Sequence, residues 1–352
     1  MTDASGIGIL GMGSYIPDTI RTNQWWPEEV VARWVEEIRT ASEEGAVNEE
    51  LSGRTIDPFM GVESRHVIAD DMSSLDIEQR AAERCLLASG VPRDRVDMVL
   101  SFSTVPEYIH VSNAYGLHER LELGERCFVL GTEGMCNSFQ QQLTLAHHMI
   151  RGGAAKYALL VQSSAMSRVM MVDWRPSVVF GDGATAVLVG PVESGFGYID
   201  SVHQVEHDAF GGVVTGVPGA RWYEGGQVFS YIEDPDKARR MLSSATTYAK
   251  TVLGALAERT EIPAAKVDFY ASHQAAEWFR EKTQASAELV NARSFDTFRE
   301  TASLSGSNIP YVMQRAVESN VLQHGDLVAM FSGAAGTVYS ATYYRWHGSS
   351  SG

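Results

Sequence analysis

Helix-like and strand-like segments alternate along the chain in a regular order. Residues 73–90, "SSLDIEQRAAERCLLASG", carry apolar positions at helix spacing, and an apolar run, "VDMVLSFST", follows at 96–104. The same order returns at 243–260 and 267–273, as "SSATTYAKTVLGALAERT" and "VDFYASH". A helix followed by a nearly continuous apolar strand is typical of parallel sheets that are covered by helices on both faces.

A second pair of segments repeats this pattern. Residues 140–150 are helix-like and precede an apolar strand at 156–165, and residues 311–321 precede another at 326–335. The first repeat has an offset of 171 residues and the second an offset of 170. Two segments that recur at nearly the same offset indicate an internal duplication.

The duplication predicts an α/β protein made of two similar halves packed together. We expect an N-terminal half at 1–190, which carries the candidate nucleophile described below, and a C-terminal half at 191–352. The apolar run near the start, "GIGILGMGSYI", is expected to form the first strand.

The offset also relates individual positions of the two halves. It pairs Cys136 with Gly306, and it pairs His273 with Phe102. Cys136 and His273 therefore lie in opposite halves, each near the carboxyl end of a strand. Sites in parallel α/β sheets collect at such ends, so we expect the two side chains to meet at a pseudo-twofold axis.

Composition and charge exclude several classes of protein. Of the 352 residues 44% are hydrophobic and 20% are charged, and the formal net charge is -16. This acidity argues against nucleic acid as a partner. No apolar run approaches the roughly 18 residues of a membrane span, and the N-terminus lacks the basic segment of a signal peptide. We expect a globular cytoplasmic protein without a membrane partner.

Three cysteines are too few for a disulfide framework and fit a reducing compartment. Cys85 lies inside a predicted helix and Cys127 enters a predicted strand, so we interpret both as inert buried thiols. Cys136 follows a glycine-containing turn in "GTEGMCNSFQQQ", where a helix begins. Because a helix N-terminus stabilises a thiolate, Cys136 is the candidate nucleophile.

Other short motifs do not predict a metal or nucleotide site. "HQVEH" at 203–207 matches a zinc-peptidase pattern, but its surroundings are strand-like and that pattern needs a helix. His147 and His148 are adjacent on a helix and cannot face one ion together. "GMGSYI" lacks the third glycine of the dinucleotide fingerprint. We expect no metal.

Several motifs occur in the order of a known family. They are "GSYIPDTIRTN" at 13–23, "GVESRHV" at 61–67, "FGDGATAVL" at 180–188, "SHQAA" at 272–276 and "FSGAAGT" at 331–337. With the cysteine after a turn, they resemble β-ketoacyl-[acyl-carrier-protein] synthase III and its secondary-metabolite relatives over nearly the whole chain. The resemblance implies a thiolase fold of five α-β-α-β-α layers and a homodimer. It also implies acyl transfer through a cysteine thioester without a cofactor, from a donor bound to coenzyme A or to the phosphopantetheine of an acyl carrier protein.

The resemblance implies roles for the candidate residues. Cys136 takes the acyl group, and His273 in "SHQAA" activates the thiol or the acceptor, which suits imidazole near neutral pH. The backbone N–H of Cys136 and one from the Gly333–Gly336 loop are expected to form the oxyanion hole.

The third catalytic position departs from the family. Its members carry an asparagine seven residues before the proline of an "SIP"-like segment, and here that position is Ser303. We interpret Asn308 as lying on the wrong side of the loop to replace it. Losing one donor to a developing anion costs about 3–4 kcal/mol of barrier, so decarboxylative condensation is disfavoured. Transfer to a small-molecule hydroxyl or amine, or to a preformed carbon nucleophile, is favoured.

Donor recognition is also altered. Relatives clamp the adenine of coenzyme A between a tryptophan and an arginine, and the matching positions are Thr55 and Phe59. This loss favours a carrier-bound donor. Trp174 and Arg175 lie near another coenzyme-contacting position of the family, and Arg280 lies on the predicted helix after His273, where a carrier protein would dock.

The leading interpretation is an acyltransferase that loads Cys136 and passes the acyl group to a second substrate. The alternative is a noncatalytic partner subunit that shapes a tunnel for an active homologue. Retention of both Cys136 and His273 argues against that alternative, because such a subunit does not need the pair.

Overall fold

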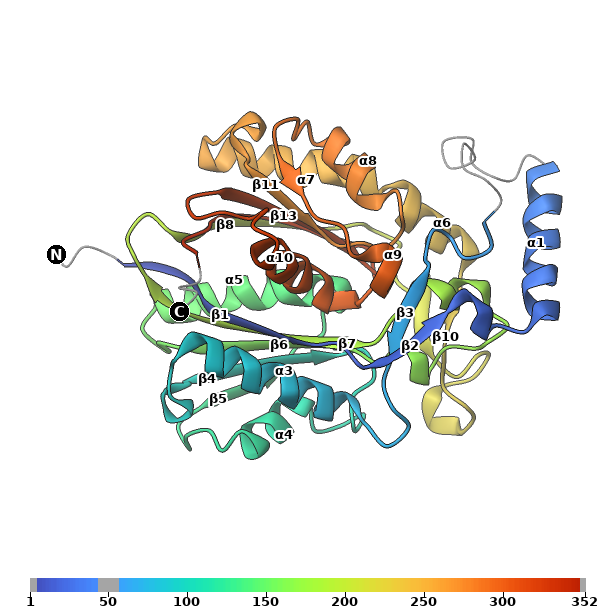
Figure 1. Cartoon of the computed structure of the whole chain (residues 1–352), viewed down its shortest axis with the longest axis horizontal. Helices are drawn as coiled ribbons and strands as arrows, with labels where there is room; N and C mark the ends of the chain where they lie inside the picture. The colour runs from blue at the N-terminus through green and yellow to red at the C-terminus, as the bar shows by residue number, and fades with distance from the viewer. Residues whose placement is uncertain (1–4, 44–56, 349–352) are drawn as a thin grey trace.

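Two stacked sheets and three layers of helices make up the chain (Figure 1). The computed structural model describes residues 5–43 and 57–348, so Thr55 lies outside the described residues. The layers follow the order α-β-α-β-α, as expected for a thiolase fold.

Each sheet has five strands, and the two sheets have corresponding orders. The first has the order β1 (Gly6–Tyr15), β7 (Gly183–Val192), β6 (Ala158–Ser164), β4 (Met98–Ser103) and β5 (Phe128–Gly131). The second has the order β8 (Gly197–Val205), β14 (Val338–Arg345), β13 (Leu327–Ala334), β11 (Phe269–Ser272) and β12 (Arg293–Ser294). In each sheet the last three strands are parallel, as the sequence predicts, and the first two run antiparallel to their neighbours.

The helices form an inner layer and two outer layers. The inner layer consists of α5 (Ser138–Arg151) and α10 (Asn308–Glu318). The outer layer on the first sheet consists of α3 (Ser74–Ser89) and α4 (Asn113–Arg120). The outer layer on the second sheet consists of α7 (Ala245–Thr260) and α8 (Phe279–Ser286). The inner core joins apolar side chains of α5 and α10 to both sheets, including Phe139, Leu143, Val312 and Met330. This burial removes apolar surface from water on both faces of each inner helix, which fixes the two sheets relative to one another.

The duplication is visible element by element. α3 and α7 both have 16 residues, and their first residues, Ser74 and Ala245, are 171 positions apart. α5 and α10 begin at Ser138 and Asn308, 170 positions apart. In the sequence, the last strand of the first sheet ends at Val192 and the first strand of the second sheet begins at Gly197. We therefore propose that the boundary between the halves lies near residue 190.

The remaining elements lie around one end of the sheets (Figure 1). They are the pair β2 (Thr19–Thr22) and β3 (Ser64–Val67), the pair β9 (Val213–Gly216) and β10 (Phe229–Ile232), and the helices α1 (Glu28–Glu43), α6 (Pro235–Ser243) and α9 (Phe298–Thr301). None of the helices in the described ranges is both long enough and apolar enough to cross a bilayer.

Candidate active site

Cys136 lies in a single 3-10 turn, Met135–Asn137, that runs directly into α5. Met135 has a φ of 47°, a left-handed conformation that is uncommon for a residue with a side chain. Cys136 is half-buried, and its Sγ lies 3.7 Å from the Oγ of Ser305 in the other half of the chain. The structure thus confirms that Cys136 opens a helix and faces the counterpart half.

The thiol is held in its protonated form. Burial raises the pKa of Cys136 to about 11, and the nearby Glu133 carboxyl adds to this, while the hydrogen bond to Ser305 opposes it. The helix N-terminus therefore does not by itself generate a thiolate at neutral pH. A base must remove the proton before the sulfur can attack.

His273 follows β11, and its backbone N–H donates to the carbonyl of Phe331 at 2.8 Å. The side chain is only 2% exposed. Burial lowers the pKa of His273 to about 4, and the nearby Asn308 side chain and Ser305 backbone partly oppose this shift. The buried Nδ1 of His273 has no hydrogen-bond partner among the described residues. The imidazole is therefore neutral at pH 7 and able to accept a proton.

The loop that joins these two residues is 303–308. The Oγ of Ser305 contacts the Sγ of Cys136. The backbone of Ser305 and the side chain of Asn308 lie near the imidazole of His273. Its 3-10 turn, Ser305–Ser307, is the counterpart of the turn that carries Cys136, and Ser305 has a φ of 53°. The dyad residues thus meet on one loop, although the described residues show no hydrogen bond between Sγ and the imidazole.

Asn308 lies inside the site, so the expectation that it is on the wrong side of the loop is wrong. It is the first residue of α10 and is fully buried. Its Oδ1 accepts from the Oγ of Ser303 at 3.1 Å and from the N–H of Leu304 at 3.2 Å. The 3-10 turn folds Asn308 back over the loop, which a count of positions from the proline does not reveal. Its buried Nδ2 has no hydrogen-bond partner among the described residues.

Gly333 lies inside strand β13 and not in a loop, which corrects the expected loop at Gly333–Gly336. A Cβ at Gly333 would lie 2.8 Å from the Tyr339 ring, so the position accepts only glycine. The hairpin of β13 and β14 is bound to the residue after the nucleophile, because Ser332 Oγ donates to Asn137 Oδ1 and Asn137 Nδ2 donates to the Val338 carbonyl. The Gly333 segment therefore does lie next to the turn of Cys136.

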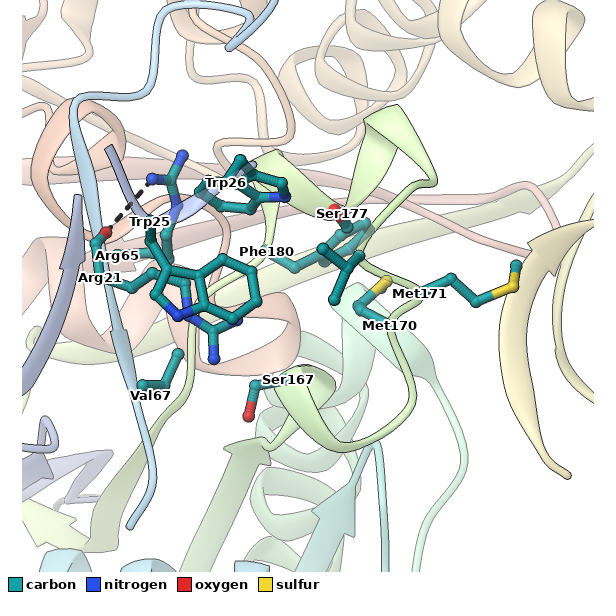
Figure 2. A pocket seen from close by; sticks show the side chains of 11 residues that line it. Arg21, Trp25, Trp26, Arg65, Val67, Ser167, Met170, Met171, Ser177 and Phe180 are labelled. Atoms are coloured by element: carbon teal, nitrogen blue, oxygen red, sulfur yellow. Dashed lines mark hydrogen bonds between the residues drawn. The ribbon is translucent and has the colours of Figure 1, made fainter. Parts of the chain in front are cut away.

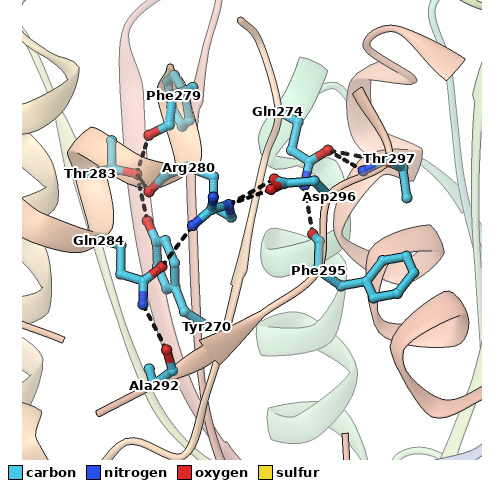
Figure 3. A network of polar contacts seen from close by, with 10 residues as sticks. All are labelled: Tyr270, Gln274, Phe279, Arg280, Thr283, Gln284, Ala292, Phe295, Asp296 and Thr297. Atoms are coloured by element: carbon cyan, nitrogen blue, oxygen red, sulfur yellow. Dashed lines mark hydrogen bonds and ion pairs between the residues drawn. The ribbon is translucent and has the colours of Figure 1, made fainter. Parts of the chain in front are cut away.

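Arg280 pairs with residues of its own chain at a partly exposed position, where its side chain is 23% exposed, so the docking role stays a prediction. Its Nε donates to both carboxylate oxygens of Asp296 at 2.7 and 2.9 Å, and its Nη1 donates to Gln284 at 3.1 Å (Figure 3). Asp296 also accepts from Gln274, whose Oε1 accepts from the Thr297 N–H at 2.9 Å. Arg280 thus helps to hold the residue that follows His273.

Trp174 and Arg175 begin the turn at Arg175–Val179 and are both partly buried. The Nε of Arg175 donates to the carbonyl of Pro58 at 3.4 Å, and the neighbouring Asp173 carbonyl accepts from Trp34 of α1. Both residues therefore lie on the side of α1, and none of these contacts involves Cys136.

A pocket that the sequence did not reveal lies between β2, β3 and this turn (Figure 2). Its residues include Arg21, Trp25, Trp26 and Arg65, of which Arg21 and Arg65 belong to motifs quoted for other reasons. Their clustering depends on the pairing of β2 with β3 across about 40 residues, and no local pattern predicts it.

Two family models match the chain. The model described as 3-Oxoacyl-[acyl-carrier-protein (ACP)] synthase III matches residues 132–206, and its C-terminal companion matches residues 257–346. The first match lies mostly in the N-terminal half and the second lies in the C-terminal half.

Relatives and solved structures extend the similarity over almost the full length. The chain is 27% identical to the β-ketoacyl-[acyl-carrier-protein] synthase III of Geobacillus kaustophilus over 97% of this chain and 99% of the relative. It is 28% identical to that of Rhodospirillum centenum over 96% and 98%. The structure is similar to 3-oxoacyl-(acyl carrier protein) synthase III of Pseudomonas aeruginosa PAO1, with a TM-score of 0.79, 20% identity and coverage of 97% and 99%. It is also similar to OleA of Xanthomonas campestris, with a TM-score of 0.77, 16% identity and coverage of 97% and 98%.

Proposed function

Because the chain is a β-ketoacyl-[acyl-carrier-protein] synthase III-like acyltransferase of the thiolase fold, we propose that Cys136 takes an acyl group from a thioester and passes it to a second, small-molecule substrate. One observation carries this proposal. The loop 303–308 contacts the sulfur of Cys136 through Ser305, and the same loop lies close enough to His273 to influence the pKa of its imidazole, so a candidate nucleophile and a candidate base lie at one loop.

In the first step His273 removes the proton of the Cys136 thiol as Sγ attacks the thioester carbonyl. At neutral pH the Cys136 thiol is protonated and the His273 imidazole is neutral, so the proton passes to His273 only together with the attack of Sγ and not before it. The backbone N–H groups of Cys136 and of the Gly333 segment stabilise the oxyanion. The bond to the donor sulfur then breaks, and the imidazolium returns its proton to the leaving thiolate.

In the second step the acceptor loses a proton to His273 and attacks the acyl carbon on Cys136. The bond between that carbon and Sγ then breaks, and the imidazolium returns its proton to the Cys136 thiolate, which restores the resting enzyme. We favour an oxygen, nitrogen or preformed carbon nucleophile over decarboxylation of a malonyl thioester. The hydroxyl of Ser303 is already donated to Asn308, so it is not free to stabilise an enolate. Asn308 is buried beside His273, and we assign it the task of positioning the imidazole.

The donor is proposed to be a coenzyme A or carrier-protein thioester, with the carrier protein favoured. Acyl exchange between thioesters transfers no electrons, so we expect the reaction to need no cofactor. Trp174 and Arg175 remain candidates for donor contact, supported by the partial exposure of both. We propose a cytoplasmic enzyme, consistent with three cysteines that form no disulfide.

A homodimer is proposed from the free edge of the first sheet. β5 ends that sheet, so one side of its backbone has no strand partner in the described chain. Phe128 and Leu130 of β5 are 47% and 38% exposed, and Tyr108, Ile109 and Val111 are more than half exposed. An uncovered strand edge with apolar side chains is a surface that folded proteins normally pair.

Intact mass spectrometry tests the proposal. The wild-type protein is incubated with acetyl- and longer acyl-coenzyme A and with acylated carrier protein, and the adduct is mapped by peptide digestion. We expect one acyl group on Cys136 and none on the Cys136→Ala variant, with Cys85→Ala as the matched control that keeps the adduct. If no donor modifies the wild type, or if Cys136→Ala is modified equally, the acyl-cysteine proposal fails and the noncatalytic subunit gains support.

A further inference from the structure

The pocket between β2, β3 and the turn before Phe180 has a charge opposite to that of the protein. It is small, with a cavity volume of about 20 Å³, and it is open to solvent at its mouth. The described residues that line it include Arg21 and Arg65 and no carboxylate, although the chain has a formal net charge of -16. Asp182 lies behind this wall, accepts from Ser167 and balances part of the positive charge. A net positive pocket in an acidic protein favours an anionic ligand.

The two arginines differ in how much of their hydrogen-bonding capacity is used. Arg65 is 1% exposed and donates to the carbonyls of Val178 and Arg21 and to the Asn23 side chain. The guanidinium of Arg21 instead stacks on the Trp25 ring at 3.6 Å and makes no hydrogen bond among the described residues. A stacked guanidinium presents its N–H edge outward, which is the geometry that binds a carboxylate or phosphate in bidentate fashion.

Two further donors in the pocket wall have no partner. The Oγ of Ser177 and the Nε1 of Trp26 are buried and make no hydrogen bond among the described residues. The two residues are 8% and 4% exposed and both line the pocket (Figure 2). Buried polar groups are nearly always hydrogen-bonded, so two orphans at one cavity indicate a missing acceptor.

The rest of the wall is apolar and continues to the catalytic loop. Met170, Met171 and Phe180 line the pocket. Phe180 forms a parallel bridge with Ser303, and the N–H of Gly181 donates to the Ser303 carbonyl at 3.0 Å. A ligand in the pocket therefore contacts the segment that is bonded to the loop beneath Cys136 and His273.

We propose that this pocket binds the carboxylate or phosphate of an organic anion, with Arg21, Ser177 and Trp26 as its ligands and the apolar part of the molecule against Met170, Met171 and Phe180. The proposal that the pocket binds an anion rests on the residues of the pocket alone. Its use as a substrate subsite rests on the proposed acyltransferase function.

Isothermal titration calorimetry tests the pocket with benzoate and phenyl phosphate as probes and neutral benzamide as the control ligand. We expect both anions to bind the wild type at least tenfold more tightly than benzamide does. Arg21→Gln is expected to weaken them at least tenfold, and Ser177→Ala by about threefold or more. Arg239→Gln removes an exposed arginine on α6 that pairs with Asp236, and it is expected to leave affinity unchanged.

Binding of benzamide as tightly as benzoate, loss of less than twofold in Arg21→Gln, or no binding of any probe would each overturn the proposal. Circular dichroism melts check that the variants are folded. Comparison of 4′-phosphopantetheine with pantetheine identifies the source of the anion. If the phosphorylated form binds more tightly and this preference depends on Arg21, the anionic group belongs to the donor. If there is no such preference but benzoate binds, the anionic group belongs to the acceptor. Anion binding without an adduct on Cys136 would refute the acyltransferase and leave the pocket.

Discussion

At the scale of single residues, the chemistry depends on two pKa values that burial displaces in opposite directions. The pKa of Cys136 is raised to about 11 and that of His273 is lowered to about 4. Between about pH 4 and pH 11 the Cys136 thiol is therefore protonated and the His273 imidazole is neutral. Catalysis by His273 should therefore be nearly independent of pH over the neutral range.

This predicts different pH profiles with and without the imidazole. Between pH 6 and 9 the rate of acyl loading on Cys136 should change by less than about threefold in the wild type. In His273→Ala it should be much slower at pH 7 and rise about tenfold per pH unit, because only the thiolate fraction reacts. Stopped mass-spectrometric time courses measure both rates. An equally flat profile in the variant would show that another group removes the proton.

Asn308 allows a second prediction. Asn308→Ala leaves Ser303 Oγ and the Leu304 N–H without their acceptor, so it should slow loading at least tenfold and destabilise the fold by about 1–3 kcal/mol. Asn308→Asp keeps that acceptor and adds a negative charge near His273, so it should raise the pKa of His273 and shift the acid limb of the rate profile to higher pH. A positioning role predicts this shift, whereas a purely structural role does not.

Asn291→Ala serves as the control, because Asn291 is exposed and its amide donates to the Ala265 carbonyl, away from the site. Acyl-loading rates as a function of pH and urea denaturation of the three variants distinguish a positioning role of Asn308 from a purely structural role. An acid limb that stays in place in Asn308→Asp would contradict the assignment.

The residues of the candidate site were predictable to different extents. The positions of Cys136 and His273 follow from strand ends and a repeat offset, which the sequence displays directly. Asn308 was misplaced because a count of positions does not give the direction of a side chain after a 3-10 turn with a positive φ at Ser305. The pocket of Arg21 was missed because its members come from segments far apart in the chain.

At the scale of elements, α3 shows how the two halves have diverged. Glu78 lies on its buried face and accepts hydrogen bonds from Ser101, Asn113 and Ser163. The position 171 residues later, in α7, is the buried Ala249. Burial raises the pKa of Glu78 to about 7, so the folded state holds this proton over a range in which the unfolded chain releases it.

This predicts a pH dependence of stability with a definite sign. A raised carboxyl pKa means that the folded state binds more protons than the unfolded state between about pH 4.5 and 7, so the contribution of Glu78 falls as pH rises through that range. Glu78→Gln should gain stability relative to the wild type from pH 5 to pH 8, by at most about 1.4 kcal/mol for each pH unit of the range. The exposed Glu119→Gln on α4 should show no such change. Urea denaturation at four pH values measures it, and a constant difference between variant and wild type would refute the buried proton.

At the scale of the whole molecule, the repeat offset and the apolar runs predicted two similar α/β halves packed together, and the family resemblance implied the five layers that the structure has. The antiparallel outer strands were not predicted, since apolar content is the same in a parallel and an antiparallel buried strand. The free edge of β5 is likewise a property of sheet order, which no segment reveals by itself.

That edge leads to a prediction of assembly. The wild type should have twice the monomer mass of 38.5 kDa at micromolar concentration. Phe128→Glu with Leu130→Glu should give a folded monomer, because charges on an edge strand oppose pairing. Leu87→Glu, at a side chain that is 84% exposed on α3, should remain a dimer. Light scattering after size exclusion measures the masses, and a monomeric wild type would contradict the proposed interface.

The counterparts of the dyad decide whether the chain has room for a second reaction centre. A pseudo-twofold axis between the halves also relates the positions of Cys136 and His273 to a second pair of positions, Gly306 and Phe102. In this chain the second centre is closed: Gly306 stands opposite Cys136, and a Cβ there would lie 3.0 Å from the Met135 carbonyl and 3.2 Å from the ring of Phe102, the counterpart of His273. The aromatic ring fills the volume that a second imidazole and thiol would need. Placing a second thiol and imidazole at Gly306 and Phe102 would therefore require a shift of the backbone as well as new side chains. The packing at these positions limits the chain to one nucleophile.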